Sequence, residues 1–142
     1  MSVMKQIQII NGPNLNLLGV REPEIYGTQT FEEYFLEIKK QFPDYAIHYY
    51  QSNHEGDLID ILHKVGFSYD GIVLNAGAYT HYSYALADAI KAIKSPVIEV
   101  HISDIYAREG FRATSVTGVN CIKIISGKGL PGYIDAIEEL IK

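Results

Sequence analysis

The sequence predicts an α/β fold in which a parallel sheet is buried between two layers of helices, and three observations lead to this prediction. Short apolar runs alternate along the whole chain with segments of helical periodicity, which is the pattern of an α/β domain. Two of the runs, IVLNA and VIEVH, are apolar enough to belong to strands covered on both faces of a sheet. The length of 142 residues, 47% of them hydrophobic, fits one domain with a buried core. We therefore expect a single domain over residues 1–142.

The order of the expected elements indicates how the sheet is connected. Strands are expected at residues 6–11, 46–52, 71–75, 97–101 and 121–126, and helices at residues 31–41, 57–65, about 83–93 and 132–141. The first helix opens with the capping box Thr30-x-x-Glu33, and the last is entered through Pro131. The apolar faces of the first two helices comprise Phe31, Phe35, Ile38 and Phe42, then Leu58, Leu62 and Val65. Five parallel strands in this length indicate a flavodoxin-like three-layer sandwich with strand order 2-1-3-4-5.

Charge and composition argue against several kinds of partner. The formal net charge of −5 argues against a nucleic-acid surface, which needs clustered lysine and arginine. The first residues lack the apolar core of a signal peptide, and no later run is long enough to cross a bilayer. The single cysteine, Cys121, cannot form an internal disulfide, which favours the reducing cytoplasm. Cys121 opens an apolar run and is more typical of a small core residue than of a nucleophile.

The carboxyl ends of the expected strands carry the polar residues. In sheets of this kind, ligands bind beyond those ends, and the strands here end at Asn11, Asn75 and His101. Two long loops, residues 12–29 and 102–120, leave from the same edge and are predicted to act as lids. All three arginines, Arg21, Arg108 and Arg112, fall in these loops. Because a guanidinium binds a carboxylate in bidentate fashion, this distribution indicates an anionic ligand.

Glu99 and His101 lie two residues apart on an expected strand and hence on one face of it. Three interpretations are open from the residues alone. Together with His81 they are a possible two-histidine, one-carboxylate metal site. Glu99 is otherwise a residue that orients a catalytic histidine, or the two form a buried polar pair without chemistry.

A glycine motif near the C-terminus, Gly127-Lys-Gly129-Leu-Pro-Gly132, matches G-x-G-x-x-G. A dinucleotide site needs a further strand and an acidic residue about 20 positions later, and this chain ends first. The motif is therefore expected to be a tight turn, or to offer backbone N–H groups to another anion.

Tyr26 stands out among eleven tyrosines because it lies in a polar loop five residues after Arg21. One guanidinium about 5 Å away at an effective dielectric of about 20 contributes about 3.3 kcal/mol. That is enough to lower a tyrosine pKa well below its usual value of about 10. The spacing makes this pair a candidate acid–base group without showing that the two side chains meet.

Taken together, these segments resemble the type II 3-dehydroquinate dehydratases in order and spacing over nearly the whole chain. The matching segments are INGPNLNLLG at residues 10–19, REPEIYG at 21–27, QSNHEGD at 51–57, LNAGAYTH at 74–81, IEVHIS at 98–103 and REGFR at 108–112. The resemblance implies a cofactor-free and metal-free elimination of water from 3-dehydroquinate, giving 3-dehydroshikimate in the shikimate pathway to aromatic amino acids. It implies no Schiff base, because none of the matched motifs contains a lysine.

The resemblance also assigns roles to individual residues. Tyr26, as tyrosinate, would remove the proton at C2, with Arg21 lowering its pKa and Asn14 holding a water against the enolate oxygen. His101 would be the general acid for the C1 hydroxyl, oriented by Glu99. Substrate binding is implied for Asn75, His81, Asp88, Ile102, Ser103 and Arg112, and Arg108 is placed in or near the lid.

The resemblance further implies a homo-oligomer, because in such enzymes the aspartate that corresponds to Asp88 usually reaches the site of a neighbouring subunit. The expected assembly is a dodecamer built from trimers. Positions that depart from the common pattern are Tyr82, Tyr84, Ala87, Gly110 and residues 113–120. They concern the subunit contacts and the lid. The alternative function is that of a flavodoxin-like small-ligand or metal-dependent hydrolase domain, which a chelator or a flavin colour would reveal.

Overall fold

A computed structural model describes residues 4–142, apart from the side chains of Ile25 and Tyr26. At its centre lies a sheet of five strands: β1 (Lys5–Asn11), β2 (Tyr45–Gln51), β3 (Gly71–Asn75), β4 (Val97–His101) and β5 (Lys123–Ser126). Their spatial order is β2-β1-β3-β4-β5, and every neighbouring pair is parallel. The predicted flavodoxin-like α/β class and the strand order 2-1-3-4-5 are thereby confirmed.

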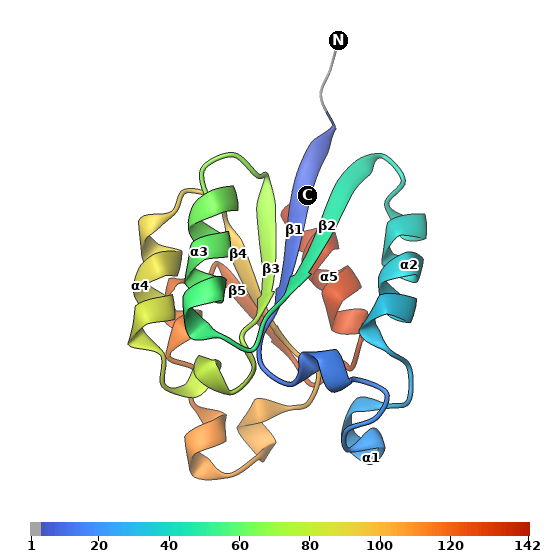
Figure 1. Ribbon diagram of the computed structural model, residues 1–142, viewed down its shortest axis with the longest axis vertical. Coiled ribbons are helices and arrows are strands. Elements are labelled where there is room, and N and C mark those ends of the chain that lie inside the picture. Colours follow the sequence, from blue (N-terminus) through green and yellow to red (C-terminus); the bar gives the residue numbers. More distant parts are fainter. Residues whose placement is uncertain (1–3) are drawn as a thin grey trace.

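Helices cover both faces of the sheet (Figure 1). One face packs against α2 (Phe31–Gln41) and α5 (Pro131–Leu140), and the other against α3 (Glu55–Val65) and α4 (Tyr84–Ala92). The core is accordingly split in two. Phe31, Ile38 and Tyr133 lie in the first half, whereas Leu58 and Leu86 lie in the second. Successive strand residues alternate between these halves, since side chains of a strand point to opposite faces.

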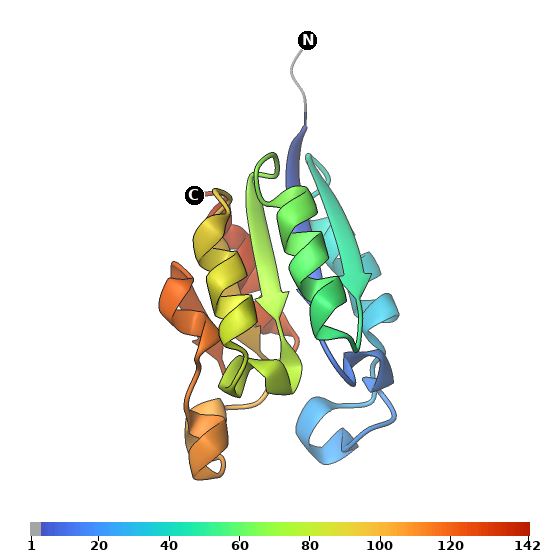
Figure 2. The same cartoon turned by 60° about the vertical axis from the view of Figure 1, so that its left-hand side comes forward.

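The two long loops contain short turns of helix and are therefore more ordered than the sequence predicts. The first holds η1 (Leu15–Leu17) and α1 (Pro23–Tyr26); the second holds η3 (Ile105–Ala107), η4 (Gly110–Ala113) and η5 (Thr117–Asn120). A further 3₁₀ turn, η2 (Gly77–His81), follows β3. Figures 1 and 2 show both loops extending from the carboxyl end of the sheet, one on either side.

The last strand begins later than expected. β5 starts at Lys123 and not at Cys121, because the N–H of Cys121 donates to the carbonyl oxygen of Gly118 at 3.1 Å and closes the preceding turn. The apolar pattern of residues 121–126 could not show this, since a turn and a strand both accept such residues. Helix α3 likewise begins two residues before the expected position. On α2, Tyr34 is buried with Phe31 and Ile38, while Phe35 is only half-buried.

Within residues 4–142, every helix is too short or too polar to cross a bilayer.

Candidate active site

A cleft opens at the carboxyl ends of β1, β3 and β4. It is lined by Pro13, Asn14, Leu15, Arg21, Asn75, Gly77, Ala78, His81, His101, Ile102, Ser103, Ile105, Arg108 and Arg112. The cleft lies where the strand order reverses between β1 and β3, the usual ligand position in such folds. All three arginines of the chain line it. An acidic chain has thus concentrated its guanidinium groups at one small surface, which suits an anionic ligand.

The loop after β1 is held in place by backbone contacts that need a glycine. The N–H of Gly12 donates to the carbonyl oxygen of Asn75 at 2.7 Å, and a Cβ at Gly12 would lie 2.6 Å from the oxygen of Ala76. Asn14 follows in the left-handed region at φ 69°, which asparagine tolerates better than most residues. Its N–H donates to Oδ1 of Asn53 at 3.0 Å. The segment after β2 therefore fixes the backbone that brings Asn14 to the cleft.

Asn75 is oriented by the hydroxyl of Tyr133, a residue outside all the motifs described above. Its Nδ2 donates to the hydroxyl of Tyr133 at 3.0 Å, and that hydroxyl donates to Oδ1 of Asn11 at 2.8 Å. Oδ1 of Asn75 accepts from the N–H of Gly77 at 3.2 Å. Both amide ends of Asn75 are thus assigned. Tyr133 is fully buried in α5 and burial raises its pKa, so the hydroxyl stays protonated and can donate.

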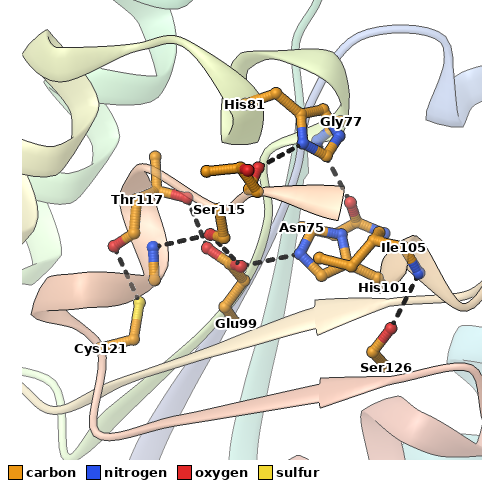
Figure 3. Close-up of polar contacts among 12 residues, drawn as sticks. Asn75, Gly77, His81, Glu99, His101, Ile105, Ser115, Thr117, Cys121 and Ser126 are labelled. Atoms are coloured by element: carbon orange, nitrogen blue, oxygen red, sulfur yellow. Dashed lines mark hydrogen bonds and ion pairs between the residues drawn. The ribbon is translucent and has the colours of Figure 1, made fainter. Parts of the chain in front are cut away.

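Glu99 and His101 form a buried pair beneath the cleft (Figure 3). Nε2 of His101 lies 2.8 Å from Oε2 of Glu99. Burial by itself raises the pKa of the Glu99 carboxyl, but hydrogen bonds and the charge of His101 lower it below its ordinary value. Because the carboxylate is ionised and can only accept, Nε2 of His101 carries a proton. Nδ1 is then the nitrogen left for the cleft, as an acceptor in neutral histidine and a donor in the imidazolium.

His81 lies over His101, with the ring centroids 6.4 Å apart. Its Nδ1 donates to the carbonyl oxygen of Thr114 at 2.7 Å, so this nitrogen is protonated and Nε2 remains for a ligand. Arg108 donates to Oγ of Ser103 at 3.5 Å, and Arg112 pairs with Glu109 at 3.2 Å. The second long loop thereby brings two guanidinium groups to the rim of the cleft.

Most of the residues predicted for the site meet in this cleft. Those that line it are Asn14, Arg21, Asn75, His81, His101, Ile102, Ser103 and Arg112, and Glu99 stands behind His101. Asp88 does not line it and is exposed on α4. The side chain of Tyr26 lies outside the described part of the chain. Its backbone forms the last residue of α1, within the first long loop.

Sequence reasoning missed three residues that support this site, Ser115, Thr117 and Tyr133, and it assigned no role to Asn53. Serine and threonine in an irregular loop have no periodicity to distinguish them, and Tyr133 looked like ordinary packing in an amphipathic helix. Only the motif around Asn53 gave a signal, because that residue follows directly after a strand.

Neither the metal nor the dinucleotide interpretation matches the geometry of the described residues. No group of three histidine, cysteine, aspartate or glutamate side chains gathers there in a way that could hold a metal ion. The N–H of Gly127 donates to the carbonyls of His101 and Ser103, and the N–H of Gly129 to that of Ile102. The glycine motif is therefore a tight turn that supports the segment after β4.

A doubly wound α/β fold with an arginine-lined cleft over its central strands defines a class of proteins that bind small anionic molecules at the sheet edge. Within that class, the sequence model of the Dehydroquinase class II family matches residues 5–141. The chain belongs to this family.

Similar proteins agree with this assignment. A 3-dehydroquinate dehydratase of Caldicellulosiruptor saccharolyticus is 52% identical over 140 residues, covering 96% of this chain and 97% of that protein. The crystal structure of a type II dehydroquinase from Butyrivibrio crossotus superposes with a TM-score of 0.94 at 47% identity, covering 97% of this chain and 98% of the other. A second type II dehydroquinase structure, from Propionibacterium acnes, gives a TM-score of 0.90 at 39% identity, with 98% of both chains covered.

Proposed function

We propose that this chain is a hydro-lyase that removes water from 3-dehydroquinate to give 3-dehydroshikimate, without a metal or an organic cofactor. The observation that carries the proposal is the buried Glu99–His101 pair below a cleft lined by three arginines. A substrate with one carboxylate and several hydroxyls matches the charge and the hydrogen-bonding groups of that cleft. The relatives described above are named for this reaction.

The first step is removal of the C2 proton, which the neighbouring ketone acidifies. Tyr26 as tyrosinate takes the proton, and the electron pair of the C–H bond moves to the ketone oxygen to form an enolate. Arg21, which lines the cleft, favours both the tyrosinate and the enolate by its charge. Asn14 holds a water against the enolate oxygen, in keeping with its anchored position at the cleft wall.

The second step is loss of the C1 hydroxyl. The enolate collapses to the ketone, a C1–C2 double bond forms, and the C–O bond breaks as Nδ1 of His101 gives its proton to the leaving oxygen. Water is released, and the proton taken by Tyr26 returns to His101 through solvent. Support comes from the ionised Glu99, which assigns the proton on Nε2 and leaves Nδ1 to the cleft.

The remaining cleft residues bind the substrate. The backbone N–H groups of Ile102 and Ser103 take the carboxylate, and Asn75, His81 and Arg112 take carboxylate or hydroxyl oxygens. Their common position in the cleft lining supports these roles. Each of these groups offers a directed donor or acceptor, which rejects analogues that lack the matching oxygen.

The proposal extends to assembly and location. Asp88 is exposed on α4 and does not line the cleft of its own chain, so we place it in the site of a neighbouring subunit. The assembly would be a dodecamer built from trimers. One cysteine and the biosynthetic reaction favour the cytoplasm and the shikimate pathway to aromatic amino acids.

The test mixes purified protein with 3-dehydroquinate in the presence of EDTA and follows the ultraviolet absorbance of the conjugated product. We expect turnover by the native protein and a loss of at least about three orders of magnitude in kcat for Tyr26→Phe, because the variant has no base. KM should change little, since Phe keeps the ring.

Each arm of this assay has a distinct meaning. A folded native protein without turnover would remove the proposed reaction. Equal turnover by the variant would keep the reaction and remove Tyr26 as its base. Turnover that EDTA abolishes would favour the metal-dependent alternative. A matched control is Tyr106→Phe, because Tyr106 is an exposed tyrosine outside the cleft lining.

A further inference from the structure

The segment of residues 114–118, here called the strap, lies against Glu99 of β4. Two contacts hold its backbone to η2. The carbonyl of Thr114 accepts from Nδ1 of His81 at 2.7 Å, and the N–H of Val116 donates to the carbonyl of Thr80 at 2.8 Å. Figure 3 shows the strap residues Ser115 and Thr117 directed at the Glu99 carboxylate.

The strap supplies two of the three hydrogen bonds that Glu99 accepts. Oγ of Ser115 donates to Oε2 of Glu99 at 2.6 Å, the same oxygen that meets His101. The hydroxyl of Thr117 donates to Oε1. Glu99 is fully buried, so these hydroxyls take the place of water around the charge. A buried carboxylate without such donors would be costly to keep ionised.

The proton of the Ser115 hydroxyl has an assigned direction. Oγ of Ser115 accepts from the N–H of Gly118 at 2.9 Å, which leaves its own proton for Glu99. A Cβ at Gly118 would lie 2.8 Å from that Oγ and would also collide with Ile124. Only glycine therefore lets the strap turn close enough for this contact.

These contacts bear on how readily His101 gives up its proton. A carboxylate whose charge is shared among three donors attracts the imidazolium proton less than one bound to histidine alone. The other titratable groups around the pair are His81 from η2, the arginines of the cleft lining, Arg21, Arg108 and Arg112, and the thiol of Cys121 near Glu99. The hydrogen bonds that Glu99 accepts come from His101, Ser115 and Thr117.

We propose that Ser115 and Thr117 are positioning residues of the acid step, which act through Glu99 on the proton transfer from His101. The proposal rests on the proposed function, since it requires a step in which His101 donates a proton. Ser115 and Thr117 do not line the cleft.

The test replaces the fully buried Thr117 by the isosteric valine and measures kcat and KM for 3-dehydroquinate across pH. Loss of one hydrogen bond to the carboxylate should lower kcat about tenfold, with KM within about twofold. The Glu99–His101 pair should hold its proton more tightly, so the basic limb of the kcat profile moves to higher pH. Thr117→Ser should restore both quantities, and Ser115→Ala should resemble Thr117→Val.

Two controls separate this role from a structural one. Thr80→Val makes the same change at another fully buried threonine, whose hydroxyl has no partner among the described residues, and should leave the kinetics unchanged. In a Glu99→Gln background, Thr117→Val should lower kcat no further, because the two changes act through one group.

Three results would overturn the proposal. One is a native kcat and pH profile in both strap variants, with only the unfolding midpoint lowered. Another is an equal loss of kcat in the Glu99→Gln background. If the native protein shows no turnover, the proposed function fails. The role of the strap residues can then still be tested by NMR titration of the histidines. The His101 signal, assigned with His101→Asn, must titrate at higher pH in Thr117→Val than in Thr80→Val; identical curves would end the proposal.

Discussion

Hydroxyl groups orient the polar side chains that line the cleft or lie beneath it. The hydroxyl of Tyr133 lies between Asn75 and Asn11, and those of Ser115 and Thr117 bind Glu99. Each reaches a strand residue: Asn11 and Asn75 end β1 and β3, and Glu99 lies two residues before the end of β4. The strand determines where the amide or carboxylate lies, and the hydroxyl determines which way it points. Orientation and position thus come from different parts of the chain.

Tyr133→Phe should weaken substrate binding more than turnover. The change leaves Nδ2 of Asn75 and Oδ1 of Asn11 without their buried partner, which costs about 1–3 kcal/mol each at most. Asn75 would then be free to rotate, and we expect KM to rise about five- to tenfold with kcat within about twofold. Steady-state kinetics and urea unfolding measure the two effects.

Tyr34→Phe is the matched control for that experiment. Tyr34 is buried, and its hydroxyl has no partner among the described residues. Burial, with Glu37 and Asp135 adding negative charge nearby, raises its pKa to about 12. Removing this hydroxyl should change neither KM nor stability by much. An unchanged KM in Tyr133→Phe would show that Gly77 alone suffices to orient Asn75.

Secondary-structure elements place the site by where they end. β1 and β3 are paired from Ile7 and Gly71 to Asn11 and Asn75, so their two terminal asparagines leave the sheet side by side. Helices pack on both faces of these strands. Helix α2 begins with a complete capping box formed by Thr30 and Glu33.

Thr30→Ala should lower the free energy of unfolding by about 1 kcal/mol without affecting catalysis. The hydroxyl of Thr30 accepts from the N–H of Glu33 at 3.1 Å, and alanine leaves that N–H unpaired at the helix end. Urea unfolding should show a lower midpoint at an unchanged slope. Thr28→Ala changes an exposed threonine two residues earlier and should leave the urea midpoint unchanged. An equal fall of the midpoint in this variant would show that the loss in Thr30→Ala does not come from the helix cap.

At the scale of the whole molecule, the exposed face of α4 carries Tyr84 and Asp88. They lie one turn apart on it, and Tyr84 is 73% exposed. Tyrosine is enriched at protein interfaces. This surface is where the proposed subunit contact would bring Asp88 to a neighbouring cleft.

Asp88→Asn should lower kcat/KM about tenfold while the protein keeps its assembly, because the change removes a charged hydrogen-bond partner and not the contact area. Sedimentation gives the mass, and steady-state kinetics give the loss. Asp60→Asn, at an exposed aspartate of α3, is the control. A fully active native monomer, or an Asp88→Asn enzyme with native kcat/KM, would contradict the shared site.

The sequence by itself determined the alternation of strands and helices, the strand order and the edge of the sheet that carries the site. These features depend on local periodicity and on the polar residues at strand ends, such as Asn11, Asn75 and His101, and both can be read along the chain. The pairing of Glu99 with His101 was also accessible, since two residues on one strand face are close by construction.

Only the tertiary structure decided which distant groups complete that site. Tyr133 meets Asn11 across 122 positions of sequence, and Thr117 meets Glu99 across 18 positions through an irregular loop. The departure of β5 from its expected start has the same origin, a turn contact between Cys121 and Gly118. Such contacts are set by how the helices and loops pack on the sheet. The hydrophobic periodicity of the sequence cannot predict these contacts. It shows which face of a helix or strand a residue lies on, but not which residue of another element packs against that face.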